Sequence, residues 1–154
     1  MKKWISLLLV CLMLMSFSAC GGEAAKEPDL QAVQDEIAST LSITPKTMNL
    51  KLIAGQRGFD EALVEQSASF TTPGAVFDDE IYLFKAVDTD AAATIASKLE
   101  GRLAELKKQT QNYSPDDAAV VDACSVLQNG KYVALFFSAN RETMESVYNS
   151  HFCS

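Results

Sequence analysis

The chain has few of the residues on which common catalytic and metal sites depend. Its 154 residues include one histidine and four cysteines, and they contain no GxSxG, SxxK or HExxH motif. The chain therefore lacks the motifs that form the usual catalytic sites of serine and zinc hydrolases. A catalytic Ser-Lys pair formed by residues from distant segments remains an alternative. Gly55 and Gly58 are not followed by the Lys-Ser of a phosphate-binding loop. The sequence predicts no catalytic residue and no cofactor.

The chain is also poor in basic residues and in long apolar runs. Thirteen Lys and Arg stand against 20 Asp and Glu, for a formal net charge of -7. Such a domain gains no electrostatic attraction to nucleic acid or to an anionic membrane surface. No apolar run reaches the roughly 20 residues that a spanning helix needs. We therefore expect no nucleic acid partner, and membrane contact only through an attached lipid.

The first 22 residues resemble a bacterial lipoprotein leader. Two lysines precede an apolar run that ends at Phe17, and Ala19 leads into Cys20. Small residues before the cysteine suit both cleavage and thioether formation, although Phe17 stands where such leaders usually have leucine. The resemblance predicts a signal peptide over residues 1–19 and a diacylglyceryl (palmitate-type) anchor on Cys20. It also implies a place on the extracytoplasmic side of the cell membrane; ordinary secretion and an uncleaved anchor are the alternatives.

The part after the leader divides into a tether and one domain. Residues 20–27 are small or charged without periodicity, which indicates a tether that reaches at most ~25 Å. Residues 28–154 have the length of a single domain. Apart from Cys20, this part contains only Cys124 and Cys153. These two either form one disulfide or stay unpaired, with one of them buried.

Hydrophobic periodicity predicts helices alternating with pairs of strands. Helical spacing predicts helices over residues 28–41, 88–113 and 115–122 and after Asn140. Alternating or continuous apolar patterns predict strands over 64–70, 81–87, 124–128 and 131–138. The last two strands flank Asn129-Gly130, a type I′ hairpin signal, whereas residues 42–63 fit either a strand or a short helix. The expected fold is α+β, with a four-stranded, mainly antiparallel sheet covered by helices.

A few residues stand out against this pattern. Lys85 lies in an apolar strand, where its ammonium either reaches solvent or lines a pocket for an anionic group. Arg57 could contact a ligand, although an exposed loop arginine is the ordinary case. His151 fits a partly buried histidine at a helix C-terminus better than it fits a catalytic base. Gly101, inside a long helix, is expected to mark close packing against the sheet.

Two groups of carboxylates flank the strand 81–87. Asp78-Asp79-Glu80 precedes it, and Asp88 and Asp90 follow it. The strand holds the two groups about 25 Å apart, so they cannot share one ion. Neither group has the alternating spacing of a calcium loop, so the sequence predicts solvated turns and no metal site.

The leader is followed by four features in a recognisable order: the strand IYLFKAVD, the long helix with Arg102, the Tyr113-Ser114-Pro115 break and the hairpin NGKYVALFFS. Together they resemble a family of small, uncharacterised lipoproteins, mostly from Gram-positive bacteria, built on a domain of unknown function. The resemblance extends over roughly residues 25–150. It implies a surface-tethered single domain, and it carries no catalytic residues over to this chain.

These observations predict a lipid-anchored extracytoplasmic domain that binds a partner protein or a small ligand, as an accessory of the cell envelope. The alternative is an extracytoplasmic hydrolase with an unconventional site, and a structural role in the envelope is a third option. A deep pocket that holds two or more polar side chains of strongly perturbed acidity would favour the hydrolase. A core without a pocket would remove it.

Overall fold

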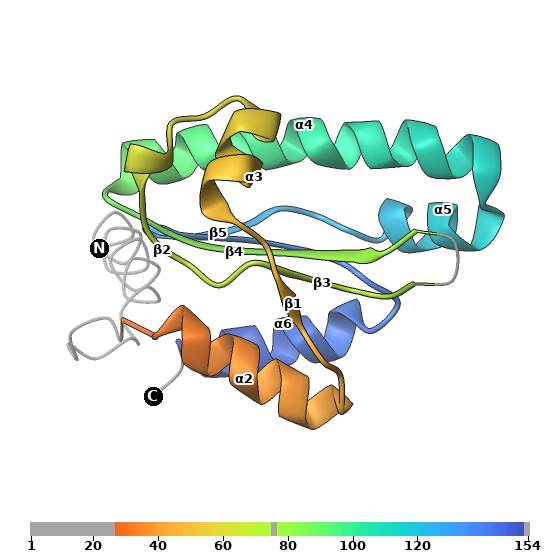
Figure 1. Cartoon of the computed structure of the whole chain (residues 1–154), viewed down its shortest axis with the longest axis horizontal. Helices are drawn as coiled ribbons and strands as arrows, with labels where there is room; N and C mark the ends of the chain where they lie inside the picture. The colour runs from red at the N-terminus through yellow and green to blue at the C-terminus, as the bar shows by residue number, and fades with distance from the viewer. Residues whose placement is uncertain (1–26, 75–76, 153–154) are drawn as a thin grey trace, which may run out of the picture.

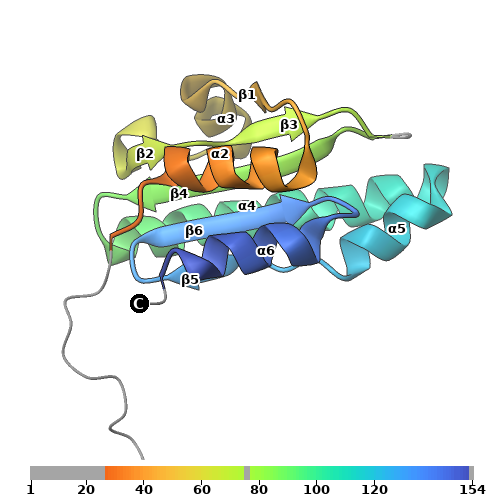
Figure 2. The ribbon, with the colours of Figure 1, turned by 90° about the horizontal axis from the view of Figure 1, so that it is seen from below.

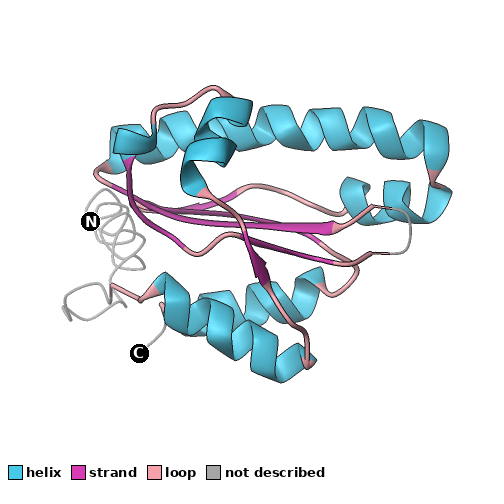
Figure 3. Ribbon diagram, viewed as in Figure 1, coloured by secondary structure: helices cyan, strands magenta, loops and turns pink. Residues whose placement is uncertain are grey.

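An antiparallel sheet lies between two layers of helices (Figure 1 and Figure 3). This computed structural model describes residues 27–74 and 77–152. The predicted signal peptide, Cys20 and Cys153 lie outside the described residues. The α+β class predicted from the sequence is confirmed, and so is the covering of the sheet by helices.

The sheet contains six strands, and every strand pair is antiparallel. The order is β1-β3-β4-β6-β5, and β2 also pairs with β4. The strands are β1 (Lys46–Thr47), β2 (Val64–Ser67), β3 (Phe70–Thr72), β4 (Asp79–Ala86), β5 (Leu127–Asn129) and β6 (Tyr132–Phe137). The two apolar runs predicted as central strands, β4 and β6, lie side by side in the middle of the sheet.

The prediction of four strands is wrong, for two local reasons. The single strand predicted over residues 64–70 is divided because Ser69 interrupts the backbone ladder. Its Oγ accepts a hydrogen bond from the Leu83 amide at 3.0 Å and lies 3.3 Å from the Leu83 carbonyl oxygen. As a result β2 and β3 follow each other along the same side of β4. The additional strand β1 has only two residues, too few for an alternating pattern to reveal it.

Five α-helices are formed by the described residues. They are α2 (Leu30–Leu41), α3 (Leu50–Arg57), α4 (Thr89–Tyr113), α5 (Pro115–Asp122) and α6 (Arg141–Ser150), with a 3-10 turn η1 (Glu61–Leu63). Residues 42–63, which fitted either a strand or a short helix, contain both: the two-residue strand β1 and the helix α3, whose first turn is capped by Asn49. No helix within the described ranges is long and apolar enough to cross a membrane.

The helix ends follow the local signals, with two adjustments. Asp88 caps α4, and Ser114 caps α5 ahead of Pro115. The helix α2 begins at Leu30, two residues after the predicted start at residue 28, and Asp29 is its N-cap. Asn140 occupies the N-cap position of α6 but makes no side-chain capping bond, because its backbone lacks the extended conformation of an N-cap.

The predicted hairpin between β5 and β6 is confirmed, but its turn lies one residue later. Asn129 pairs with Tyr132, so the two loop residues are Gly130 and Lys131. Gly130 has φ +55, and Lys131 is not among the residues with positive φ. Glycine at the first loop position with a positive φ is typical of a type II′ turn, and this turn replaces the expected type I′.

The two faces of the sheet carry separate apolar clusters, because neighbouring strand residues point to opposite sides. Tyr82 and Phe84 pack with α3, α4 and α5 on one face. Ile81 and Leu83 pack with α2 and α6 on the other face, where Figure 2 shows these two helices side by side. Four aromatic side chains of β4 and β6 are buried: Tyr82, Phe84, Phe136 and Phe137.

Candidate functional site

A cleft of about 660 Å³ opens on the α2–α6 face of the sheet, at the end where β4 begins. Its volume lies in the usual range for small-molecule sites, about 300–1,000 Å³. Apolar walls come from Ile43, Pro73 and Met144. The other lining residues are polar: Thr44, Lys46, Thr71, Thr72, Asp78, Asp79 and Asn140. We call this hollow the Asp79 cleft.

Asp79 is the residue of the cleft at which three chain segments meet. Its Oδ2 accepts hydrogen bonds from the Thr72 hydroxyl at 3.2 Å and from the Ser138 hydroxyl at 2.7 Å. The Ser138 oxygen in turn accepts from the Asn140 amide at 3.0 Å. No described residue donates to Asp79 Oδ1. A carboxylate oxygen of this kind can accept further hydrogen bonds.

The environment of Asp79 disfavours its charge. Burial raises the pKa of the Asp79 carboxyl above its ordinary value, against the hydrogen bonds from Ser138 and Thr72, which lower it. The nearby carboxylates of Asp117 and Asp78 raise this pKa further. A carboxyl group with a perturbed pKa in a cleft is a recognised sign of a functional site.

We expect Asp79→Asn to stabilise the protein at pH 7. The folded-state pKa is raised, so the stability that this carboxyl contributes is full below its unfolded pKa and is lost as the pH rises through the folded value. Asparagine keeps an acceptor for Ser138 and removes the charge. Urea unfolding should show a gain of about 0.5–1 kcal/mol at pH 7, which fades toward pH 4.

The matched control for that substitution is Asp78→Asn, at the exposed neighbouring position. We expect it to change the free energy of unfolding by less than about 0.5 kcal/mol. If Asp79→Asn were the less stable of the two, the hydrogen bonds of the carboxylate would outweigh its burial.

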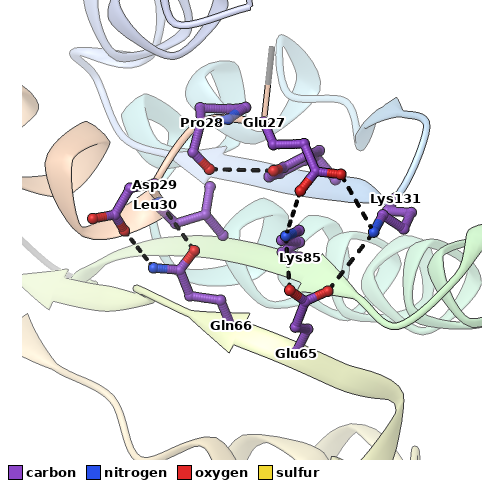
Figure 4. A network of polar contacts seen from close by, with 9 residues as sticks. Glu27, Pro28, Asp29, Leu30, Glu65, Gln66, Lys85 and Lys131 are labelled. Carbon is purple, nitrogen blue, oxygen red and sulfur yellow. Dashed lines mark hydrogen bonds and ion pairs between the residues drawn. The ribbon is translucent and has the colours of Figure 1, made fainter. Parts of the chain in front are cut away.

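The second polar feature, which we call the Lys85 cluster, consists of Glu27, Glu65, Lys85 and Lys131 (Figure 4). Lys85 Nζ lies 3.0 Å from a Glu27 oxygen and 2.7 Å from a Glu65 oxygen. Lys131 Nζ lies 3.6 Å and 3.8 Å from the same two carboxylates. Hydrogen bonds to Glu65 and Glu27 raise the pKa of Lys85. The anionic partners of Lys85 thus come from the chain itself, and its side chain is only 12% exposed.

Further bonds attach the residues after Glu27 to the same end of the sheet (Figure 4). Gln66 donates through its side-chain amide to Asp29 and accepts from the Leu30 amide at 3.2 Å. The Tyr132 hydroxyl donates to the Pro28 carbonyl at 3.2 Å. Lys85 lies six positions after Asp79 on β4, which corresponds to about 20 Å of strand. The first described residues and the Asp79 cleft therefore lie at opposite ends of β4.

The surroundings of Arg57 and Gly101 differ from those predicted from the sequence. Arg57 ends α3, but its side chain is only 14% exposed and its Nη1 lies 3.0 Å from Glu105 Oε2. The expectation of an exposed loop arginine is therefore wrong. A Cβ at Gly101 would meet nothing within 4 Å, so the expected close packing against the sheet is also wrong.

His151 and Cys124 lie outside the Asp79 cleft. His151 is partly buried at the C-terminus of α6, as expected, and its Nε2 lies 2.8 Å from Glu36 Oε2 on α2. Cys124 is buried, with its Sγ 3.1 Å from the Phe136 carbonyl oxygen. Burial raises the pKa of its thiol to about 11. A disulfide with Cys153 stays a prediction, because Cys153 lies outside the described residues.

The acidic groups that flank β4 have separate local roles. Asp79 and Glu80 point to opposite faces of the sheet, Asp88 caps α4, and Asp90 lies in the first turn of that helix. Within residues 27–74 and 77–152, no group of three or more His, Cys, Asp or Glu side chains could hold a metal ion.

The sequence reasoning missed the role of Asp79. It placed Asp79 in a solvated turn, whereas the carboxylate is partly buried and bonded to Ser138, 59 positions away. No local pattern contains a contact of that separation. The one signal was the strand itself: extending it to residue 79 places Asp79 and Glu80 on opposite faces.

Comparisons with known proteins give one match. The sequence model of a family described as a domain of unknown function, DUF4358, matches residues 39–138. This range contains Thr72, Asp79 and Ser138, and it ends where β6 leads into α6. No curated protein and no solved structure matches the chain. Since the matched range is well over half of the sequence, the chain belongs to the DUF4358 family.

Proposed function

We propose that the chain is a lipid-anchored, extracytoplasmic binding domain that accepts a small polar ligand in the Asp79 cleft. The leader-like N-terminus supports the anchor at Cys20, through resemblance to bacterial lipoproteins. The cleft supports binding, since it combines an accessible volume of small-molecule size with hydroxyl, amide, ammonium and carboxylate groups. A role as an accessory of the cell envelope follows from the anchor.

The observation that carries this proposal is the position of Glu27. The tether predicted over residues 20–27 ends at Glu27, which Lys85 and Lys131 hold at one end of the sheet. The Asp79 cleft opens at the other end, about 20 Å along β4. A lipid on Cys20 would therefore leave the cleft directed away from the bilayer, where a ligand can reach it.

The cleft suits binding better than hydrolysis. Ser138 donates to a carboxylate, as a nucleophilic serine would donate to a base, but it is only 1% exposed. Its oxygen also accepts from the Asn140 amide, so the hydroxyl orients Asp79 and does not face a substrate. Asp79 Oδ1 and Lys46 instead suit a ligand that carries hydroxyl or amino groups together with an acceptor.

The test uses full-length protein carrying its own leader, expressed in a bacterium that matures lipoproteins and reconstituted in vesicles. Intact mass should show a diacylglyceryl group on Cys20. A fluorophore is attached at Asn129→Cys or at Lys46→Cys in a Cys153→Ser background, since both positions are exposed and Cys124 is buried. Asn129 marks the end near the Lys85 cluster, and Lys46 marks the cleft.

We expect a quencher in the lipid headgroups to quench the label at position 129 more than the label at position 46, because quenching falls steeply over the ~20 Å between them. Equal or reversed quenching would refute the orientation. An unmodified Cys20 in the mass spectrum would refute the anchor.

A further inference from the structure

A small pocket between α3 and α4 gathers three cations in an otherwise acidic protein. Arg57, Lys98 and Arg102 line this pocket, whose volume is about 290 Å³, and Glu105 lies at its edge. It lies on the α4 face of the sheet, opposite the face that holds the Asp79 cleft. We call it the arginine pocket.

The Arg102 guanidinium is held in place before any ligand arrives, and the Arg57 side chain is mostly buried. Arg102 Nε donates to Glu80 Oε2 at 2.9 Å, its Nη2 donates to Glu80 Oε1, and its side chain is 12% exposed. Arg57 is 14% exposed, and α3 and α4 contact each other beside it. A planar guanidinium fixed in this way loses little freedom when it binds an anion.

Glu105 already shows how an anion can be held in this pocket. Its Oε2 alone accepts from Arg57 Nη1 at 3.0 Å and from Arg102 Nη1 at 3.3 Å, so one carboxylate oxygen bridges the two arginines. The Glu105 side chain is 60% exposed, and exposed ion pairs contribute little to stability. Among the described residues, Glu105 is the one hydrogen-bond acceptor of the Arg57 guanidinium. Glu105 is therefore a weakly held anion that a better one can displace.

Gly101 leaves the pocket open. It lies in the interior of α4, where glycine lowers helix stability relative to alanine. Close packing does not require it, because a Cβ there would meet nothing within 4 Å. A larger residue at this position of the pocket lining would occupy the space between Lys98 and Arg102.

We infer that the arginine pocket binds a small oxyanion, a carboxylate or a phosphate group. The oxyanion takes the place of the Glu105 carboxylate between Arg57 and Arg102, and Lys98 supplies a further charge from the rim. Arginine pairs recognise both kinds of oxyanion through paired N–H donors. This binding site is separate from the Asp79 cleft, and it does not depend on the lipid anchor.

The test measures binding of two probes, inorganic phosphate and acetate, to the full-length protein in detergent by calorimetry at pH 7, with chloride holding the ionic strength constant. Arg57→Gln should weaken binding at least tenfold, as expected for a lost charged hydrogen bond. Glu105→Gln should strengthen binding roughly threefold, because it removes the competing anion. Lys108→Gln removes an exposed charge from the same helix and should change nothing.

The direction in which Glu105→Gln changes the affinity for the probe distinguishes a ligand site from a purely structural ion pair. Tighter binding to Glu105→Gln supports the site even if Arg57→Gln fails to fold. Preference for phosphate or for acetate tells which oxyanion the pocket takes. The inference is overturned if neither probe binds, if Glu105→Gln weakens binding, or if Arg57→Gln and Lys108→Gln behave alike. None of these results bears on the Asp79 cleft.

Discussion

Arg102→Met is expected to destabilise the protein by about 3–5 kcal/mol, because it leaves the Glu80 carboxylate buried without its counter-ion. The two side chains are 12% and 18% exposed, and the pair is bidentate. After the substitution, the Tyr82 hydroxyl, 2.7 Å away, would be the one donor to the Glu80 side chain left among residues 27–74 and 77–152. Urea unfolding at pH 7 measures the loss.

The loss should shrink as the pH falls. Burial acts to raise the pKa of Glu80, but hydrogen bonds from Arg102 and Tyr82 hold it below its ordinary value. In the unsubstituted protein, Glu80 thus contributes stability that is present above its unfolded pKa and lost as the pH falls through the folded value. Without Arg102, burial is left to raise this pKa, so acid favours the folded variant.

Two further variants test whether the unpaired Glu80 charge causes the loss of stability. Glu80→Gln combined with Arg102→Met removes the uncompensated charge and should recover about 1–3 kcal/mol of the loss. Arg141→Met breaks a pair with Glu145 in the same helix that has a single hydrogen bond, against two for Arg102 and Glu80, and it should cost less than about 1 kcal/mol. Equal losses for Arg102→Met and Arg141→Met would contradict a buried-charge mechanism.

Leu135→Ala should cost about 2–5 kcal/mol, through lost apolar contact and the cavity left behind. Leu135 is fully buried on β6, opposite Tyr82 on β4, and it belongs to the cluster under α4. The closely packed sheet leaves little room for neighbours to fill the space. The thermal midpoint should fall by roughly 10 °C.

The same chemical change at Leu52 provides the control. Leu52 lies on α3 and is 59% exposed, so Leu52→Ala should alter stability by less than about 0.5 kcal/mol. A comparable loss at both positions would mean that Leu135 does not pack in the core as described.

The sequence predicted those elements whose signals are local. The helices predicted over 88–113 and 115–122 and the apolar strands predicted over 81–87 and 131–138 each depend on a few neighbouring residues, and each is found in the structure. The division between β2 and β3 was missed, because it depends on a bond from Ser69 to Leu83 on another strand. The hairpin turn moved by one residue, because the pairing of β5 with β6 fixes the register more firmly than the Asn-Gly dipeptide does.

The residues of the candidate sites were much harder to predict from the sequence than the helices and strands. Asp79, Thr72 and Ser138 are separated in sequence, as are Arg57 and Arg102, and each is ordinary among its own neighbours. Only the folded sheet brings them together. Lys85 and Arg57 are exceptions, since a charge in an apolar strand marked Lys85 and the segment between Gly55 and Gly58 marked Arg57 as a possible ligand contact. Their partners could not be identified from the sequence.

The edge strands of the sheet determine how readily two molecules can pair through their strands. The outermost strands β1 and β5 have two and three residues, and β2 has four. Past the end of β5, the Cys124 sulfur contacts the Phe136 carbonyl of β6 and occupies a position that a strand partner would take. Neither long apolar strand thus offers a neighbouring molecule a continuous ladder to join, which disfavours edge-to-edge pairing between copies of the chain.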